Sequence, residues 1–575
     1  MRPPRVGRGL RGLPFEEPHQ AMVNNMSASA AAVQTVPVAD IGGRKKTTAG
    51  KDSAADVLKR RASKELVVAF MGAVGCGLPR VITQCASDLR RLGYVVHHIK
   101  LSEFIKEQIE AGLVSVGDEG SSRYLRYQSG GNALRAAHGY DVLARYAVNR
   151  IGRQRLADNP DSADESRELA PVAYLIDQIK HPDEVSLLRF VYRRLFYLVG
   201  VMSIEDDRTS RLVDEGLDEG TVAEVMRRDR KESEDHGQQL EKAFKQADYF
   251  IHHPLGDRLK LVEKQLERFV SLIHGDNVVA PTKHEHAMYL AHSTALKSAC
   301  LSRQVGASIT DRSGRVIAVG ANDVPQFGGG LYGNDSPNDA RCMHSGVCEN
   351  DAQKQARRTK IETAIWQMIR SVPKDPDAEI NEEAVNELIA RVYAQSGVPD
   401  LIEFSRAVHA EMDALISLAR DGSGSTVGGT LYTTTFPCHN CARHIIAAGI
   451  DRVYYIEPYE KSLATTAHKD AIAVLDHDVQ EQFTEAKGGA DQVRLDEPAK
   501  VKFIHFSGVA PRLYPEVFHR PFGRKDGAGS WHRYSEGSSS PPEKIIREYL
   551  DSYRRFELKV MDMFTDDFGK SVARS

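Results

Sequence analysis

The residues best suited to chemistry in this 575-residue chain are one histidine and two cysteines in its second half. They occur in the stretches His409-Ala-Glu411 and Pro437-Cys-His-Asn-Cys441. One imidazole and two thiolates can hold Zn²⁺ at three tetrahedral positions and leave the fourth to water, as in catalytic rather than structural zinc sites. The spacing therefore predicts a catalytic zinc ion bound by His409, Cys438 and Cys441.

Glu411 is the expected general acid and base of this site. It follows the histidine ligand by two residues, so its carboxylate can face the zinc-bound water without binding the metal. Zinc lowers the pKa of bound water toward about 7, which makes hydroxide available at neutral pH. The order His-x-Glu followed by Pro-Cys-x-x-Cys is typical of zinc enzymes that deaminate nucleobases. The sequence thus predicts hydrolytic removal of an amino group.

Alternating helical and strand patterns place these residues in a second domain, residues 282–506. The two cysteines begin a predicted helix, where exposed amide groups and the helix dipole favour thiolates. A long polar insertion, residues 323–403, interrupts the domain. The pattern predicts an α/β/α sandwich with helices over 283–298, 409–420, 438–448 and near 467–475, and strands over 304–310, 315–320, 430–434 and 452–456.

The first domain, residues 63–273, has the pattern of a parallel α/β sheet with helices on both faces. A glycine-rich turn with Gly72, Gly75 and Gly77 follows its first strand and precedes a helix, as in a P-loop that cradles phosphate. Leu78-Pro79 stands where that motif needs a lysine and a hydroxyl residue. The turn therefore either senses a nucleotide or serves strand–helix packing alone. Strands are expected at 65–70, 94–99, 173–176, 197–201 and 249–251.

Composition restricts the remaining classes. The chain has 76 Lys and Arg residues against 79 Asp and Glu residues, so no global positive field marks a polyanion-binding protein. Seven cysteines are too few for a disulfide scaffold, and no apolar run reaches the roughly 18 residues that span a bilayer. We expect a cytoplasmic protein with a disordered extension at 1–62 and a C-terminal tail at 507–575 that contains a helix near 544–556.

The sequence resembles the deoxycytidylate deaminase family through His409-Ala-Glu-Met-Asp413, Pro437-Cys-His-Asn-Cys441 and Ser302-Arg-Gln-Val-Gly-Ala307. With its degenerate P-loop kinase-like first domain, the chain looks more specifically like two-domain bacterial antiphage dCTP/dCMP deaminases. The stretches Ile176-Asp-Gln-Ile-Lys-His-Pro182 and Gly328-Gly-Gly-Leu-Tyr332 support this. The resemblance implies conversion of free dCTP and/or dCMP to deoxyuridine nucleotides, depletion of dCTP in antiphage defence, a regulatory nucleotide or RNA at the first domain, and a homo-oligomer.

The same resemblance implies two further substrate contacts. Asn322 occupies the family position that hydrogen-bonds the sugar 3′ hydroxyl, and Arg303 is a candidate for the phosphate because a guanidinium matches phosphate geometry. The alternatives are an asparagine that caps a turn and a solvated surface arginine.

A second, structural zinc ion is the expected role of four soft ligands around the insertion. Related deaminases carry such an ion at comparable positions, and a closed Cys3His site would pin an insertion that cannot bury a core of its own. Free thiols are the alternative. The four expected ligands are Cys300, Cys342, His344 and Cys348.

Two other functions are compatible with the motifs. One is deamination of cytosine in single-stranded DNA or RNA, which needs an open basic channel with aromatic platforms. The other is a nucleotide- or RNA-sensing switch whose deaminase output is secondary.

Overall fold

The structure is a computed structural model. It describes residues 63–116, 122–158, 171–230, 236–255, 259–276, 278–371, 381–422, 424–458, 462–475, 499–519, 525, 529 and 550–568. The extension expected at 1–62 lies outside the described residues. Within these ranges, no helix is both long and apolar enough to cross a membrane.

The first sheet is built on five parallel strands. They are β1 (Glu65–Gly72), β2 (Val95–Lys100), β3 (Val172–Asp177), β4 (Phe196–Met202) and β5 (Tyr249–His252). The order across the sheet is β12-β5-β4-β1-β3-β2, where β12 (Gly508–Val509) is a short antiparallel strand. Every residue of the central strand β1 is buried, which explains its continuous apolar run.

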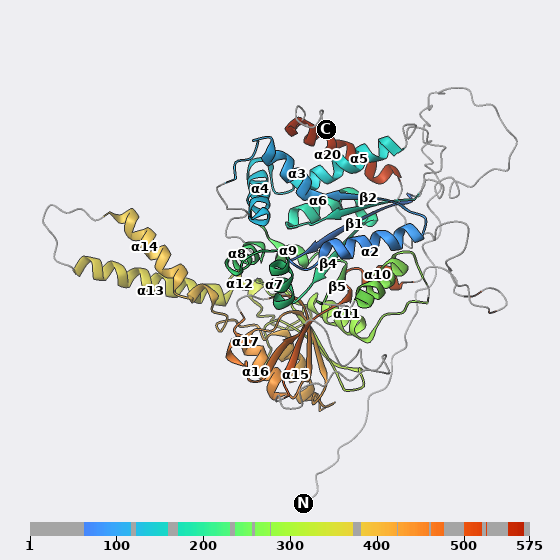
Figure 1. The fold of residues 1–575 in the computed structure, drawn as a ribbon. Helices are drawn as coiled ribbons and strands as arrows, with labels where there is room; N and C mark the ends of the chain where they lie inside the picture. Colours follow the sequence, from blue (N-terminus) through green and yellow to red (C-terminus); the bar gives the residue numbers. More distant parts are fainter. Residues whose placement is uncertain are drawn as a thin grey trace, which may run out of the picture. The chain divides into compact units, whose positions relative to one another are not determined.

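Helices cover both faces of this sheet, as the sequence predicts (Figure 1). Alternate β1 residues point to opposite faces, so Leu66 and Val68 join one hydrophobic cluster while Val67 and Ala69 join another. The first cluster includes α2 (Leu78–Arg91) and α10 (Leu259–Ile273). The second includes α3 (Leu101–Glu110), α5 (Val142–Asp158), α6 (Pro182–Tyr192) and α9 (Leu240–Phe244). The domain also contains α4 (Arg123–His138), α7 (Glu205–Asp214) and α8 (Glu219–Arg230).

The second sheet mixes antiparallel and parallel pairs in the order β10-β11-β9-β8-β6-β7. Strand β6 is antiparallel to β7 and β8, and the remaining neighbours are parallel. Helix α11 packs in the cluster on one face, and α15 and α16 pack in the cluster on the other. The elements are α11 (Lys283–Ala295), β6 (Gly306–Thr310), β7 (Val316–Ala321), α15 (Ala410–Asp421), β8 (Thr430–Thr435), α16 (His439–Ala447), β9 (Arg452–Glu457), β10 (Ile472–Leu475) and β11 (Val501–His505).

The helix predicted near 467–475 is wrong. A short helix, α17 (Ala464–Ala467), is followed by strand β10, which pairs in parallel with β11. Four apolar residues fit a strand or a buried helical turn equally well. The backbone partners that β11 offers decide between the two.

The insertion forms its own helices, α12 (Cys342–Ser345), α13 (Glu349–Ser371) and α14 (Glu382–Gln395). Helices α13 and α14 contact each other, and no residue of α13 is buried. The insertion therefore adds little to the cores of the two sheets.

The chain after residue 506 returns to the first sheet. Strand β12 (Gly508–Val509) pairs antiparallel with β5, and α19 (Tyr514–Phe518) contacts α10. Helix α20 (Leu550–Phe568), red in Figure 1, lies beside α5, far from it in the sequence. The expected C-terminal helix thus exists: its described part spans residues 550–568 and packs on the first sheet's helices.

Buried charges fix α20 in that place. Arg155 of α5 donates from Nε to a carboxylate oxygen of Glu65 at 2.6 Å and forms an ion pair with Glu557 of α20. Tyr192 also donates to Glu557, at 2.8 Å. Because all of these groups are buried, the helix cannot leave without exposing unpaired charges.

Candidate active site

The structure brings His409, Cys438 and Cys441 together at the ends of two helices. His409 is the N-cap of α15 and Cys438 is the N-cap of α16. Nδ1 of His409 lies 3.3 Å from each of the two sulfur atoms. A tetrahedral zinc ion with bonds of about 2.1 Å to nitrogen and about 2.3 Å to sulfur separates such ligand atoms by about 3.6 Å. The three side chains therefore fit the ion that the sequence predicts.

The electrostatics of the two cysteines also suit a cation. The Cys438 sulfur accepts a hydrogen bond from the Cys441 amide at 3.4 Å, and the Cys441 thiol holds the pKa of Cys438 down at about 4. The same contact and burial raise the pKa of Cys441. The hydrogen bond to Cys438 also raises the pKa of His409. A zinc ion bound between these groups would neutralise the two thiolates.

Glu411 lies against this group without joining it. Its side chain is 4% exposed, and burial raises the pKa of its carboxyl group. One carboxylate oxygen lies 3.4 Å from the Cys441 sulfur, and the other is 3.5 Å from the Thr433 hydroxyl. A carboxyl group that holds a proton more readily than usual is suited to general acid and base work.

A cavity of about 320 Å³ opens beside these groups. His409, Glu411 and Cys438 line it, together with residues from β8 and from the insertion. Lys354 of α13 and Thr435 of β8 are two lining residues that sequence reasoning missed. The run of three threonines before Phe436 was a signal for polar groups at a strand end, whereas nothing in the sequence marks Lys354 out from other lysines of the insertion.

The structure places both predicted substrate residues on this cavity. The Asn322 side chain donates to the Arg303 carbonyl at 2.8 Å and accepts from the Val305 amide at 2.7 Å. It therefore shapes the 303–305 segment as well as facing the cavity. Nη1 of Arg303 lies 3.8 Å from Oε2 of Glu457, which also pairs with Lys245 of the first domain at 2.8 Å.

The structure does not bring Cys300, Cys342, His344 and Cys348 within ligand distance of one another. Across the described ranges, the only group of three or more His, Cys, Asp or Glu ligand atoms within 4.8 Å is His409, Cys438 and Cys441. Cys300, Cys342 and Cys348 do line one small cavity of about 20 Å³. His344 instead pairs through Nε2 with Asp339 at 3.0 Å.

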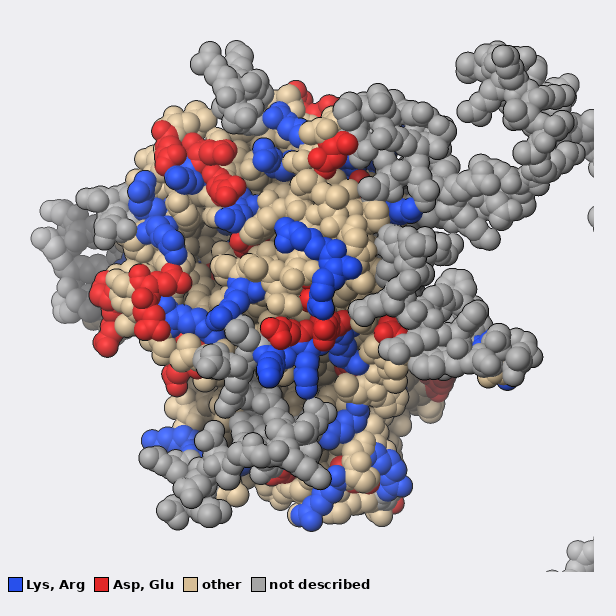
Figure 2. Space-filling view, turned by 45° about the vertical axis from the view of Figure 1, so that its right-hand side comes forward, with Lys and Arg blue, Asp and Glu red and all other residues tan. Residues whose placement is uncertain are grey.

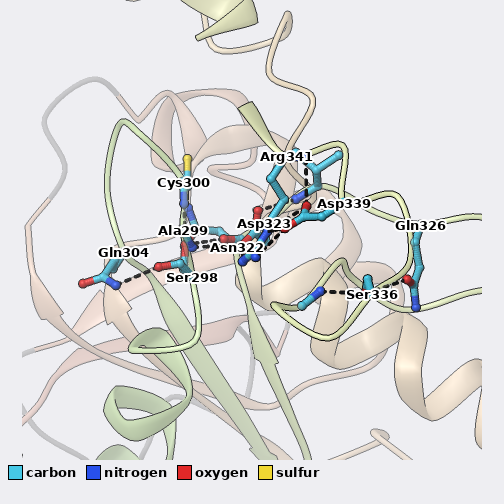
Figure 3. Close-up of polar contacts among 12 residues, drawn as sticks. Ser298, Ala299, Cys300, Gln304, Asn322, Asp323, Gln326, Ser336, Asp339 and Arg341 are labelled. Carbon is cyan, nitrogen blue, oxygen red and sulfur yellow. Dashed lines mark hydrogen bonds and ion pairs between the residues drawn. The ribbon is translucent and has the colours of Figure 1, made fainter. Parts of the chain in front are cut away.

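An ionic cluster holds the start of the insertion, a task that the sequence assigned to a second zinc ion (Figure 3). Arg341, 5% exposed, forms a bidentate contact with Asp339 and lies 3.6 Å from Asp323. Asp323 accepts from the Ala299 amide at 2.9 Å. The hydrogen bonds from Arg341 lower the pKa of Asp339. The insertion is thereby tied to the segment that carries Cys300.

The glycines of the N-terminal turn lie apart from this site, between β1 and α2 of the first sheet. Gly75 and Gly77 have φ angles of 81° and 77°, a region that favours glycine. These two positions therefore favour glycine, and the expected role of the loop in binding phosphate stays a prediction.

Comparison with known proteins addresses the second domain. Residues 281–457 match the family model described as the cytidine and deoxycytidylate deaminase zinc-binding region. This region is similar to that family. It contains His409, Glu411, Cys438 and Cys441, the residues that the geometry places together.

Proteins similar to this region occur in phages and bacteria. A deoxycytidylate deaminase of Enterobacteria phage T4 is 28% identical over 182 residues, which cover 31% of this chain and 80% of the phage protein. ComE operon protein 2 of Bacillus subtilis is 38% identical over 93 residues, 16% of this chain and 41% of that protein. The solved dCMP deaminase of cyanophage S-TIM5, in complex with dCMP and dUMP, is 20% identical and covers 33% of this chain and 93% of its own, with a TM-score of 0.19.

Proposed function

We propose that residues 282–506 form a zinc-dependent deaminase that converts free deoxycytidine nucleotides, dCMP and/or dCTP, to deoxyuridine nucleotides. The observation that carries the proposal is the juxtaposition of His409, Cys438 and Cys441 with the buried carboxyl group of Glu411 beside a cavity. The family of the region and its deoxycytidylate deaminase relatives support it.

Each residue has a distinct part in the reaction. His409, Cys438 and Cys441 would hold zinc, which supplies a Lewis acid that makes hydroxide available from water at neutral pH. Glu411 would transfer two protons of the water in turn, the first to the ring nitrogen and the second to the leaving amine, so that water and the cytosine base become the uracil base and ammonia. Burial holds the Glu411 carboxyl group ready to carry that proton.

The cavity favours a free nucleotide over a polynucleotide. Arg303 and Lys354 supply positive charge for a phosphate group, and Phe436 is the one aromatic residue among those that line the cavity. A strand-binding groove needs several aromatic platforms in a continuous basic track. On the face drawn in Figure 2, basic and acidic side chains are interspersed outside the grey atoms. The single-strand function is therefore the weaker candidate.

The first domain, residues 63–273, is proposed to regulate the deaminase through a nucleotide or RNA. Two contacts support communication between the two sheets. Lys245 reaches Glu457 beside the cavity, and Nε2 of His252 on β5 donates to the His505 carbonyl at 3.0 Å. Depletion of dCTP in antiphage defence, a cytoplasmic location and a homo-oligomer are parts of the proposal that rest on the family resemblance.

The test is ammonia release and product chromatography with the full chain and dCTP, dCMP, CTP, cytidine or a cytosine-containing single strand. We expect turnover of a free deoxynucleotide, zinc at one or more ions per chain, and loss of turnover in Glu411→Gln. Glu387→Gln, an exposed glutamate on α14, is the matched control. Product from the single strand alone would refute the free-nucleotide assignment, and full activity in Glu411→Gln would refute the mechanism.

A further inference from the structure

Side chains of the first domain itself pack against the glycine-rich loop and occupy the space around it. The side chain of Cys76 is 1% exposed, and burial raises its pKa to about 11, so the thiol stays neutral. A side chain at Gly75 would meet the backbone of Arg208. Nη1 of Arg211 donates to the Gly75 carbonyl at 2.9 Å. The loop is therefore packed under α7 and α8 rather than open to solvent.

A carboxylate from α8 occupies the inside of the loop. Asp229 is 0% exposed, and its Oδ2 accepts a hydrogen bond from the Val74 amide at 2.6 Å. Its Oδ1 lies 2.5 Å from Nζ of Lys180, which also donates to the Gly72 carbonyl at 2.8 Å. A loop amide and a buried ammonium group thus converge on one anionic group.

This arrangement has the chemistry of a phosphate site. Loops of this kind bind phosphate through backbone amides and one lysine, and here the lysine position of the motif is Leu78. Lys180, from the segment between β3 and α6, supplies the missing cation from another part of the fold. Lys180 is 7% exposed, so its charge needs a buried anion as partner. Asp229 provides that anion in the place where a phosphate oxygen would lie.

The helix that carries Asp229 is held by a small apolar contact. Val222, Val225 and Met226 of α8 cluster with Val74 of the loop and Leu212 of α7. Gln128 of α4 donates to the Val225 carbonyl at 3.0 Å. This cluster is separate from the two larger clusters on the faces of the first sheet. Release of α8 would therefore leave the sheet intact.

We propose that the Gly72–Gly77 loop and Lys180 form a binding site for the phosphate groups of a nucleotide, and that the Asp229 carboxylate occupies this site as an internal competitor. A phosphate binds only in the fraction of molecules in which α8 has withdrawn Asp229, so the apparent affinity falls by that fraction. The proposal does not depend on the deaminase chemistry of the second domain.

The test is calorimetric titration of the full chain with inorganic pyrophosphate at low ionic strength. Asp229→Asn keeps the shape of the side chain and removes its charge, so we expect pyrophosphate to bind at least tenfold more tightly than to the wild type. Adding Lys180→Met should abolish that gain. Asp214→Asn, an exposed aspartate on α7, is the matched control and should bind as the wild type does.

The double variant with Asp229→Asn and Lys180→Met distinguishes pyrophosphate binding at the loop from binding in the deaminase cavity, because that cavity is the same in all the proteins compared. Equal affinity of the wild type and Asp229→Asn would overturn the proposal, and so would a gain that survives Lys180→Met. If circular dichroism shows that Asp229→Asn does not fold, Asp229→Ser replaces it in the same comparison, with the same expected tenfold gain and the same refuting results.

Discussion

Gly320 of β7 controls how closely helix α15 approaches the second sheet. A β-carbon at this position would lie 2.5 Å from the Ala414 amide nitrogen and closer still to the carbonyl oxygen of Ala410. Ala410 stands between the candidate metal ligand His409 and the candidate catalytic residue Glu411. The absence of a side chain at Gly320 is therefore a condition for the position of both residues.

Substitution Gly320→Ala should displace the first turn of α15. Ordinary van der Waals contact begins at 3.4 Å, so relief of the closer contact, to the Ala410 carbonyl oxygen, requires the strand and the helix to separate by about 1.1 Å. A misplacement of about 1 Å in a catalytic group costs about 100-fold in rate. Overpacking of this kind also costs about 1–3 kcal/mol of folding stability. We expect a folded protein with kcat lowered about 100-fold and weakened zinc binding.

The assay is steady-state deamination with zinc analysis and a thermal melt on each protein. Gly333→Ala is the matched control, since its β-carbon would meet no atom within 4 Å and its φ angle is not in the left-handed region. The control should keep wild-type activity and stability. A folded Gly320→Ala protein with kcat within threefold of the wild type and full zinc content would refute the reasoning.

Three further perturbations test contacts between segments that are distant in the sequence. Burial lowers the pKa of His252 from 6.5 to about 4 and that of its neighbour His505 from 6.5 to about 3. As the pH falls below 6.5, these histidines therefore take up protons in the unfolded chain before they do so in the folded protein. The stability that is present above pH 6.5 should fall as the pH drops toward 4. For His252 alone the loss of folding stability approaches ~3 kcal/mol. Denaturation at several pH values should show that the stability of His252→Asn depends less on pH than that of the wild type. The same pH dependence in both proteins would contradict this. Arg155→Met leaves two buried carboxylates without their cation and should lower the folding stability by about 3–5 kcal/mol. The expected readouts are a lower melting temperature and release of α20 by a protease. An unchanged melting temperature would argue against this. Lys245→Met removes the cation beside Glu457 and should raise the KM for a nucleotide at low salt without changing kcat. The expected increase is only roughly two- to fivefold, because the ion pair is partly exposed to solvent. A lowered KM would contradict this prediction.

Sequence patterns predicted the local parts of the site and most of the fold. His409 and Glu411 are two residues apart, and Cys438 and Cys441 begin one helix, so short-range geometry places each pair before any tertiary contact forms. The strands of the first sheet were predictable because a strand buried on both faces must be apolar throughout.

Contacts between distant segments could not be read in this way. Lys354 reaches the cavity because the insertion folds back to it, and α20 lies on α5 because Arg155 meets Glu557 across 402 positions. Of the four soft ligands expected around the insertion, Cys300, Cys342 and Cys348 line one small cavity, whereas His344 pairs with Asp339.

The sequence by itself predicted which residues could bind zinc and move a proton, because those expected roles follow from residue type and close spacing. Only the tertiary structure decided what fills the glycine-rich loop. Its sequence shows the missing lysine at Leu78, whereas the replacement cation Lys180 and the internal anion Asp229 come from segments more than 100 residues away along the chain. Burial forces such charges to find a partner, and the partner is chosen by packing rather than by sequence distance.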